Sequence, residues 1–120
     1  MIDDFVEQHR FLGPAVAQIV ADHVAGLGTR RVTPTATPAE LEKLFEEPLP
    51  ENGIALEEIL ARFKTEIAPN AMGVPSPRYF GQFNPTPLPI GVWADALASM
   101  LNQNAGAWRN GPTSAMIEAA

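Results

Sequence analysis

The sequence has 120 residues, 46% of them hydrophobic, a composition that suits one small globular unit. Without cysteine it has neither a disulfide nor a thiolate metal site, and we predict no metal. A formal charge of -6 argues against nucleic acid, and no apolar run approaches the roughly 20 residues that cross a bilayer, so we expect a cytoplasmic protein without membrane contact.

The first predicted element is an amphipathic helix from Phe5 to Leu27. Apolar residues recur there at steps of three, four and seven, which places them on one face of a helix. Gly28 is a typical stop signal. Because Pro14 lacks a backbone N–H, we expect a kink or a break at Gly13-Pro14.

Two shorter helices follow an extended linker at residues 30–38. Thr37 and Glu40 bracket Pro38 in the pattern of a capping box, which predicts a helix that ends near Glu46. Apolar residues at helical spacing then predict a third surface helix over residues 56–67.

Catalytic patterns are absent from this first half. Eight of the fourteen acidic residues lie between Glu40 and Glu66, spread over polar helix faces, where acids normally serve solvation. His9 and His23 have no carboxylate at ligand spacing, so we interpret them as solvated or partner-facing. The sequence contains no phosphate loop, nucleophile elbow or zinc-protease motif. We therefore predict no catalytic residue in this chain.

The charged residues are distributed unevenly. Residues 1–66 carry 18 of the 22 charged side chains, and residues 67–120 carry four. Exposed protein surfaces are normally rich in charge, so this second stretch is expected to lie against other protein.

The segment from 75 to 89 contains five prolines and three aromatic residues, which excludes an interior helix or a central strand. A loop stiffened in this way can present rings and amides to a ligand. The alternative is a connector whose aromatic residues fill a core, and the residues alone do not favour either interpretation.

A helix that is apolar on nearly all faces is predicted from Ile90 to Leu101, and three flanking helices are too few to bury it. Residues 102–111 form a polar loop. Pro112 suits the first turn of a further helix, which we expect to be unfinished at Ala120.

The second half resembles a known family. Ser-Pro-Arg-Tyr-Phe-Gly at 76–81 and the helix that contains Asp95 are similar to the early part of the group II pyridoxal-phosphate-dependent decarboxylases, which act on aromatic amino acids, glutamate or tyrosine. Further matching positions are Asn102, Asn104, Trp108, Pro112 and Glu118. Residues 31–34 and 56–60 resemble the N-terminal helices of that family more loosely.

The resemblance implies a mainly α chain: an N-terminal helical segment of a fold-type I enzyme, incomplete as an independent fold. Residues 1–74 would form a helical dimerisation segment, and residues 75–120 the substrate-pocket loop and the start of the large domain. The expected partners are the remainder of the enzyme and a second subunit of a homodimer. The family uses pyridoxal 5'-phosphate as an electron sink, bound through a lysine. Neither Lys43 nor Lys64 has the surroundings of that lysine, so we assign no cofactor-binding residue here.

Only substrate-pocket walls carry over from the family. Gln82, Phe83, Asn84 and Pro85 stand where aromatic-amino-acid decarboxylases have tyrosine, phenylalanine, proline and threonine, with Thr86 next in line. Asn104 and Gly106 fall where the partner subunit's loop closes the pocket. Trp108 matches a family tryptophan that either contacts substrate or supports packing. Because only Phe83 is retained, the small amino-acid substrate stays open.

These observations lead to one main hypothesis and two alternatives. The chain is predicted to be part of a pyridoxal-phosphate-dependent carboxy-lyase of amino-acid metabolism, and to be inactive alone. One alternative is a stand-alone helical interaction module that dimerises through its apolar last third. The other keeps the cofactor but changes the reaction to oxidative or transamination-type chemistry, because fold does not fix reaction.

Overall fold

The computed structural model describes residues 2–81, 83–104 and 106–120. The predicted mainly α class is confirmed, since the described residues form helices and turns without a strand. The chain divides into two compact units, residues 1–84 and residues 85–120. The predicted functional division at residue 74 stays a prediction, because compactness does not test what each part does.

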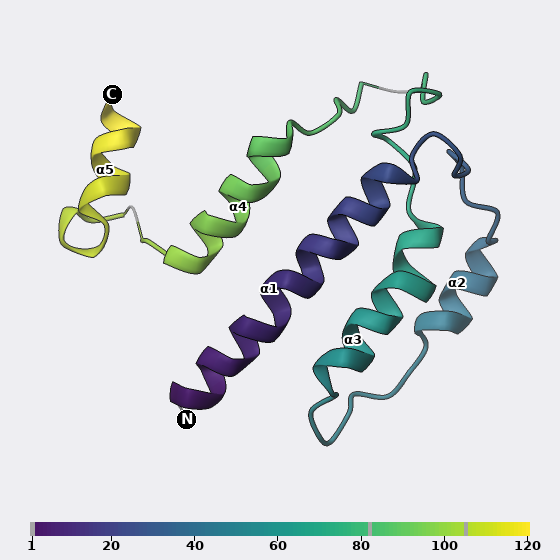
Figure 1. The fold of residues 1–120 in the computed structure, drawn as a ribbon, viewed down its shortest axis with the longest axis horizontal. Coiled ribbons are helices and arrows are strands. Elements are labelled where there is room, and N and C mark those ends of the chain that lie inside the picture. The colour runs from purple at the N-terminus through teal and green to yellow at the C-terminus, as the bar shows by residue number, and fades with distance from the viewer. Residues whose placement is uncertain (1, 82, 105) are drawn as a thin grey trace. The chain divides into compact units, whose positions relative to one another are not determined.

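Helix α1 spans Ile2–Ala25 without interruption (Figure 1). Of the kink or break predicted at Gly13-Pro14, the break is wrong, because Pro14 lies inside the helix, and the kink stays a prediction. The proline removes one helical hydrogen bond, that to the carbonyl of Arg10, but the apolar pattern continues on both sides of it and Arg10 is an exposed residue. Asp3 and Asp4 in the first turn match the helix dipole.

Helix α2 spans Pro38–Phe45 and begins with the predicted capping box. The Thr37 backbone N–H donates to Glu40 Oε2 over 2.7 Å, and the Glu40 backbone N–H donates to Thr37 Oγ1 over 3.3 Å. These reciprocal bonds satisfy two backbone donors that a helix start otherwise leaves unpaired.

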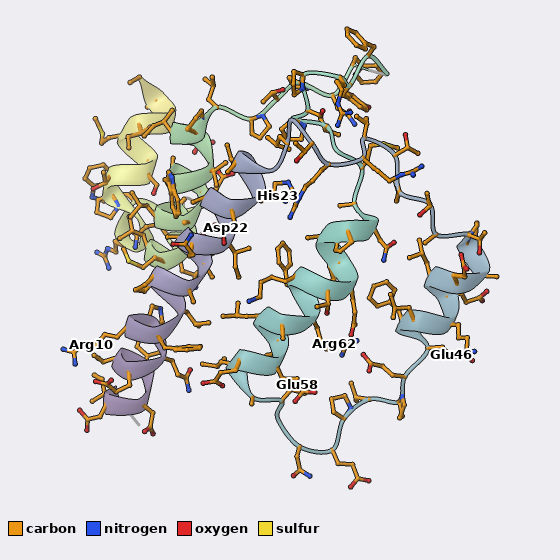
Figure 2. The ribbon with its side chains drawn as sticks, turned by 45° about the vertical axis from the view of Figure 1, so that its right-hand side comes forward. Arg10, Asp22, His23, Glu46, Glu58 and Arg62 are labelled. Atoms are coloured by element: carbon orange, nitrogen blue, oxygen red, sulfur yellow. The ribbon has the colours of Figure 1, made fainter. Side chains whose placement is uncertain are left out.

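Helix α3 spans Leu56–Arg62 and continues as a π-helical turn over Phe63–Ile67 and a 3-10 turn over Ala68–Asn70. The predicted third helix is confirmed. Arg62 pairs with Glu66 at 2.9 Å and with Glu47 at 2.8 Å, so the segment after α2 is held to α3. Figure 2 shows Arg62 on the side of α3 that faces α2, and within this unit α3 lies between α1 and α2.

The second unit contains helix α4 over Pro89–Leu101, a 3-10 turn over Trp108–Asn110 and helix α5 over Pro112–Ala119. The predicted helices at 90–101 and from Pro112 onward are confirmed. Helix α4 ends at Asn102, which takes the left-handed conformation with φ of 44°. Asparagine tolerates this conformation better than most residues, and it turns the chain out of the helix.

Neither unit has an apolar core. Among the described residues no hydrophobic side chain is buried, and on α4 Ile90, Leu97 and Met100 are 72%, 59% and 62% exposed. The chain therefore keeps apolar surface that a complete fold would cover, in line with the predicted incompleteness.

Candidate functional site: a proline-rich loop anchored to the end of helix α1

The proline-rich loop begins at a close crossing with the segment that follows α1. The backbone N–H of Gly73 donates to the carbonyl of Val32 over 2.7 Å. A Cβ at residue 73 would lie 3.2 Å from Val32 Cα and 3.3 Å from the Arg31 carbonyl oxygen. Glycine is needed here because of this close approach, not because of an unusual φ.

Ser76 fixes the next turn of the loop. It is 6% exposed, and it is the one buried polar residue that the described ranges contain. Its hydroxyl donates to the Leu27 carbonyl over 3.4 Å and accepts from the Arg78 backbone N–H over 3.2 Å. The Arg78 guanidinium donates to the Arg30 carbonyl. The loop is thus tied to the turn after α1 by groups 48 and 49 residues apart in sequence.

The predicted pocket-wall residues after this anchor are exposed. Gln82 lies outside the described residues. Phe83 is 97% exposed and Asn84 is exposed at the end of the first unit, while Pro85 and Thr86 are exposed at the start of the second. These side chains are therefore available to a ligand or to covering protein, and whether they contact substrate stays a prediction.

The other predicted pocket residues lie in the loop after α4. The Asn104 side-chain oxygen accepts from the Gly106 backbone N–H over 2.9 Å, which closes a tight turn. Gly111 is buried against this turn, and a Cβ there would lie 3.0 Å from the Asn104 carbonyl oxygen. Trp108 begins the 3-10 turn and is 59% exposed. The structure brings Asn104 and Gly106 together, whereas a role in substrate binding stays untested.

A small cleft that sequence reasoning missed lies beside the loop anchor. It measures about 260 Å³ and is formed by the end of α1, the following turn and the segment around Met72. Its polar lining consists of His23, Arg30, Arg31 and Ser76. The sequence offered one weak signal, a histidine in the last helical turn followed by glycine and arginine, but the opposite wall comes from residues 68–76 and has no local signature.

His23 and Arg30 form the polar contact of this cleft (Figure 2 labels His23 near the end of α1). Arg30 Nη1 lies 2.6 Å from His23 Nδ1, so Nδ1 accepts and the proton of a neutral ring resides on Nε2. Burial, together with the positive charge of Arg30, lowers the pKa of His23 below its ordinary 6.5. His23 is therefore held neutral at physiological pH.

The described residues do not fit pyridoxal phosphate. The cofactor needs a lysine amine in a sheltered pocket, a carboxylate beside the pyridine nitrogen and a phosphate cradle. Lys43 and Lys64 are both exposed. Lys64 does line a second cleft of about 210 Å³ with Asp22 and His23, but Lys64 is exposed and ligand pockets usually exceed about 300 Å³.

Among the described residues, no group of three or more His, Asp or Glu side chains lies close enough to hold a metal ion. None of the described helices is both long enough and apolar enough to cross a membrane.

Comparison with solved structures places the fold. The chain matches the crystal structure of Rhodiola rosea 4-hydroxyphenylacetaldehyde synthase with a TM-score of 0.73 and 21% identity, over 93% of this chain and 23% of that one. The fold is thus that of a helical segment of a much larger enzyme, as the predicted fold class requires.

Comparison of sequences is consistent with the structural match. The chain is 30% identical over 117 residues to a tyrosine decarboxylase of Oryza sativa subsp. japonica. The aligned region covers 93% of this chain and 21% of the relative. No family model matches. Both matched proteins are group II pyridoxal-phosphate-dependent decarboxylases, so the predicted resemblance to this family is confirmed over most of the chain. The chain spans about a fifth of the length of the curated relative.

Proposed function

We propose that this chain is the N-terminal helical portion of a pyridoxal-phosphate-dependent amino-acid decarboxylase, which supplies subunit contacts and walls of the substrate pocket. The observation that carries the proposal is the 30% identity to a tyrosine decarboxylase over 93% of a chain that has no apolar core among its described residues. A helical segment of this kind is stable when other protein covers its apolar side chains.

The exposed apolar side chains support the proposed subunit contacts. Obligate protein interfaces are more hydrophobic than transient ones and resemble a domain core cut in half. The exposed apolar residues of α1 and α4 are of the type that such interfaces bury, so we assign them to contacts with the remainder of the enzyme and with a second subunit.

The loop residues supply the proposed pocket walls. Phe83 offers a ring face, Asn84 and Asn104 offer amides, and Thr86 offers a hydroxyl, and each of these groups can contact a small amino acid. Gln82, Pro85, Gly106 and Trp108 complete the proposed set. We place the cofactor lysine outside this chain, because the described residues do not fit pyridoxal phosphate. On this proposal the 120-residue chain has no activity by itself.

A second candidate reaction follows from the names of the relatives. One relative is named for the decarboxylation of tyrosine and the other for the synthesis of an aldehyde. The same cofactor supports both outcomes, so the complete protein releases either an amine or an aldehyde. Because Gln82 and Pro85 differ from the residues that aromatic-amino-acid decarboxylases have at these positions, the proposal does not specify the side chain of the substrate.

The test compares two samples loaded with pyridoxal phosphate: the complete protein that contains this chain, and the 120-residue chain alone. Each is incubated with a panel of aromatic, acidic and small amino acids while CO2, amine and aldehyde are measured. We expect CO2 from the complete protein only. Turnover by the short chain, or borohydride trapping of the cofactor on Lys43 or Lys64, would contradict the proposal. An inactive complete protein whose short chain dimerises would instead support an interaction module.

A further inference from the structure

The beginning of the proline-rich loop is attached to the turn after α1 by three hydrogen bonds. Gly73 donates to the Val32 carbonyl, Ser76 to the Leu27 carbonyl and Arg78 to the Arg30 carbonyl. All three donors belong to six consecutive residues, and all three acceptors belong to residues 27–32. The attachment is therefore a local seam between two segments that are distant in sequence.

The acceptor side of this seam is itself held in place. The backbone N–H groups of Thr29 and Arg30 both donate to the Gly26 carbonyl, over 3.1 and 2.9 Å, which fixes the turn after α1. The side chain of Arg30 is held by His23 Nδ1 at 2.6 Å. The Arg30 carbonyl, which accepts from Arg78, is thus held in position by contacts that do not involve the loop.

On the donor side of the seam, Ser76 is buried. Ser76 is 6% exposed, and its hydroxyl both donates to Leu27 and accepts from the Arg78 backbone. A buried hydroxyl that is satisfied in both directions is costly to displace. Within the described ranges Arg78 has no ion pair, so its guanidinium acts on the seam and not on a surface carboxylate.

We infer that Ser76 and Arg78 are positioning residues, which fix the point at which the chain leaves the seam toward Phe83 and Asn84, and so restrict the place of that part of the pocket wall. This inference rests on the proposed function for its link to substrate. Phe83 follows Arg78 by five residues, so the seam limits how far Phe83 and Asn84 can move from the turn after α1. A loosened seam therefore lets both residues move without altering either side chain.

Loosening the seam has a defined kinetic effect. A wall that is ordered only part of the time costs substrate binding in proportion to the lost population, while the reacting groups, which other residues hold, are unaffected. For a partly exposed charge-assisted hydrogen bond we expect KM to rise about three- to tenfold, with kcat within about twofold of the wild type.

The variants are made in the complete protein loaded with pyridoxal phosphate. Arg78→Gln removes the charged donor, and Arg78→Lys keeps a charged donor at the same position. Ser76→Ala removes the buried hydroxyl. Arg31→Gln is the matched control: it removes a neighbouring exposed arginine that makes no hydrogen bond in this seam. The measurements are KM, kcat, the unfolding temperature and the rate at which chymotrypsin cleaves at Tyr79, Phe80 and Phe83.

We expect Arg78→Gln and Ser76→Ala to raise KM and accelerate chymotrypsin cleavage in the loop, Arg78→Lys to recover most of both, and Arg31→Gln to change neither. A lower unfolding temperature with unchanged KM and cleavage would overturn the inference, because the residues would then serve stability alone. A complete protein without activity would overturn the proposed function instead, and the cleavage rates would still decide whether the seam holds the loop.

Discussion

The crossing at Gly73 gives the sharpest prediction of local stability. In Gly73→Ala the new methyl group would lie 3.2 Å from Val32 Cα and 3.3 Å from two carbonyl oxygens, those of Arg31 and Val32. All three neighbours are backbone atoms, so no flexible side chain can move aside. The two segments must separate, which also stretches the 2.7 Å hydrogen bond from Gly73 to Val32.

The magnitude follows from two opposing effects. Overpacking of a tight contact costs about 1–3 kcal/mol. Replacing glycine by alanine at an ordinary φ returns about 0.4–1 kcal/mol by restricting the unfolded chain, and Gly73 does have an ordinary φ. The expected net loss in free energy of local unfolding is about 1–2 kcal/mol.

Gly28→Ala is the matched control for this prediction. Gly28 lies in the turn after α1, also has an ordinary φ, and a Cβ there meets nothing within 4 Å. We expect it to be neutral or slightly stabilising. The assay is hydrogen exchange of peptides covering residues 26–34 and 70–78 in the complete protein, which reports local opening. Equal exchange in the two variants would refute the steric reasoning.

Three further predictions follow from the described contacts. Thr37→Ala should destabilise α2 by about 1 kcal/mol through loss of its N-cap, whereas Thr37→Ser should not, as amide exchange across residues 38–45 will show. Burial and a nearby arginine lower the pKa of His23, so the unfolded state binds a proton at a higher pH than the folded state. Folding near the cleft should therefore weaken as pH falls below 6.5, and His23→Gln should remove this dependence from an unfolding titration. Gly111→Ala should displace the Asn104 turn, and in the complete protein a raised KM with unchanged cofactor content would mark that turn as part of the pocket, whereas an unchanged KM would argue against it.

The elements that the sequence predicted well depend on local chemistry. Thr37 and Glu40 are three residues apart, so their hydrogen bonds form within one helical turn and leave a readable pattern. The apolar run at 90–101 and Pro112 likewise act on their own segment. Pro14 misled the prediction, because a single proline removes one hydrogen bond while the flanking helical residues preserve all the others.

The candidate site was predictable in part only. Composition predicted the proline-rich loop. The seam that holds it joins Ser76 to Leu27 and Arg78 to Arg30, across 49 and 48 residues. No periodicity or motif encodes such a pairing in one sequence. The cleft beside His23 was missed for the same reason, since its two walls come from residues 23–31 and 68–76, which are distant in sequence.

The lack of buried apolar side chains among the described residues affects how long this polypeptide survives in the cell. A chain whose described apolar residues all remain accessible presents, while unassembled, the kind of surface that chaperones and proteases recognise. If other protein covers this surface, as proposed above, the lifetime of the chain depends on how quickly that protein binds, and not on the chain's own unfolding rate. Substitutions on the outer faces of α1 and α4 would accordingly change abundance through assembly, even where they leave every helix intact.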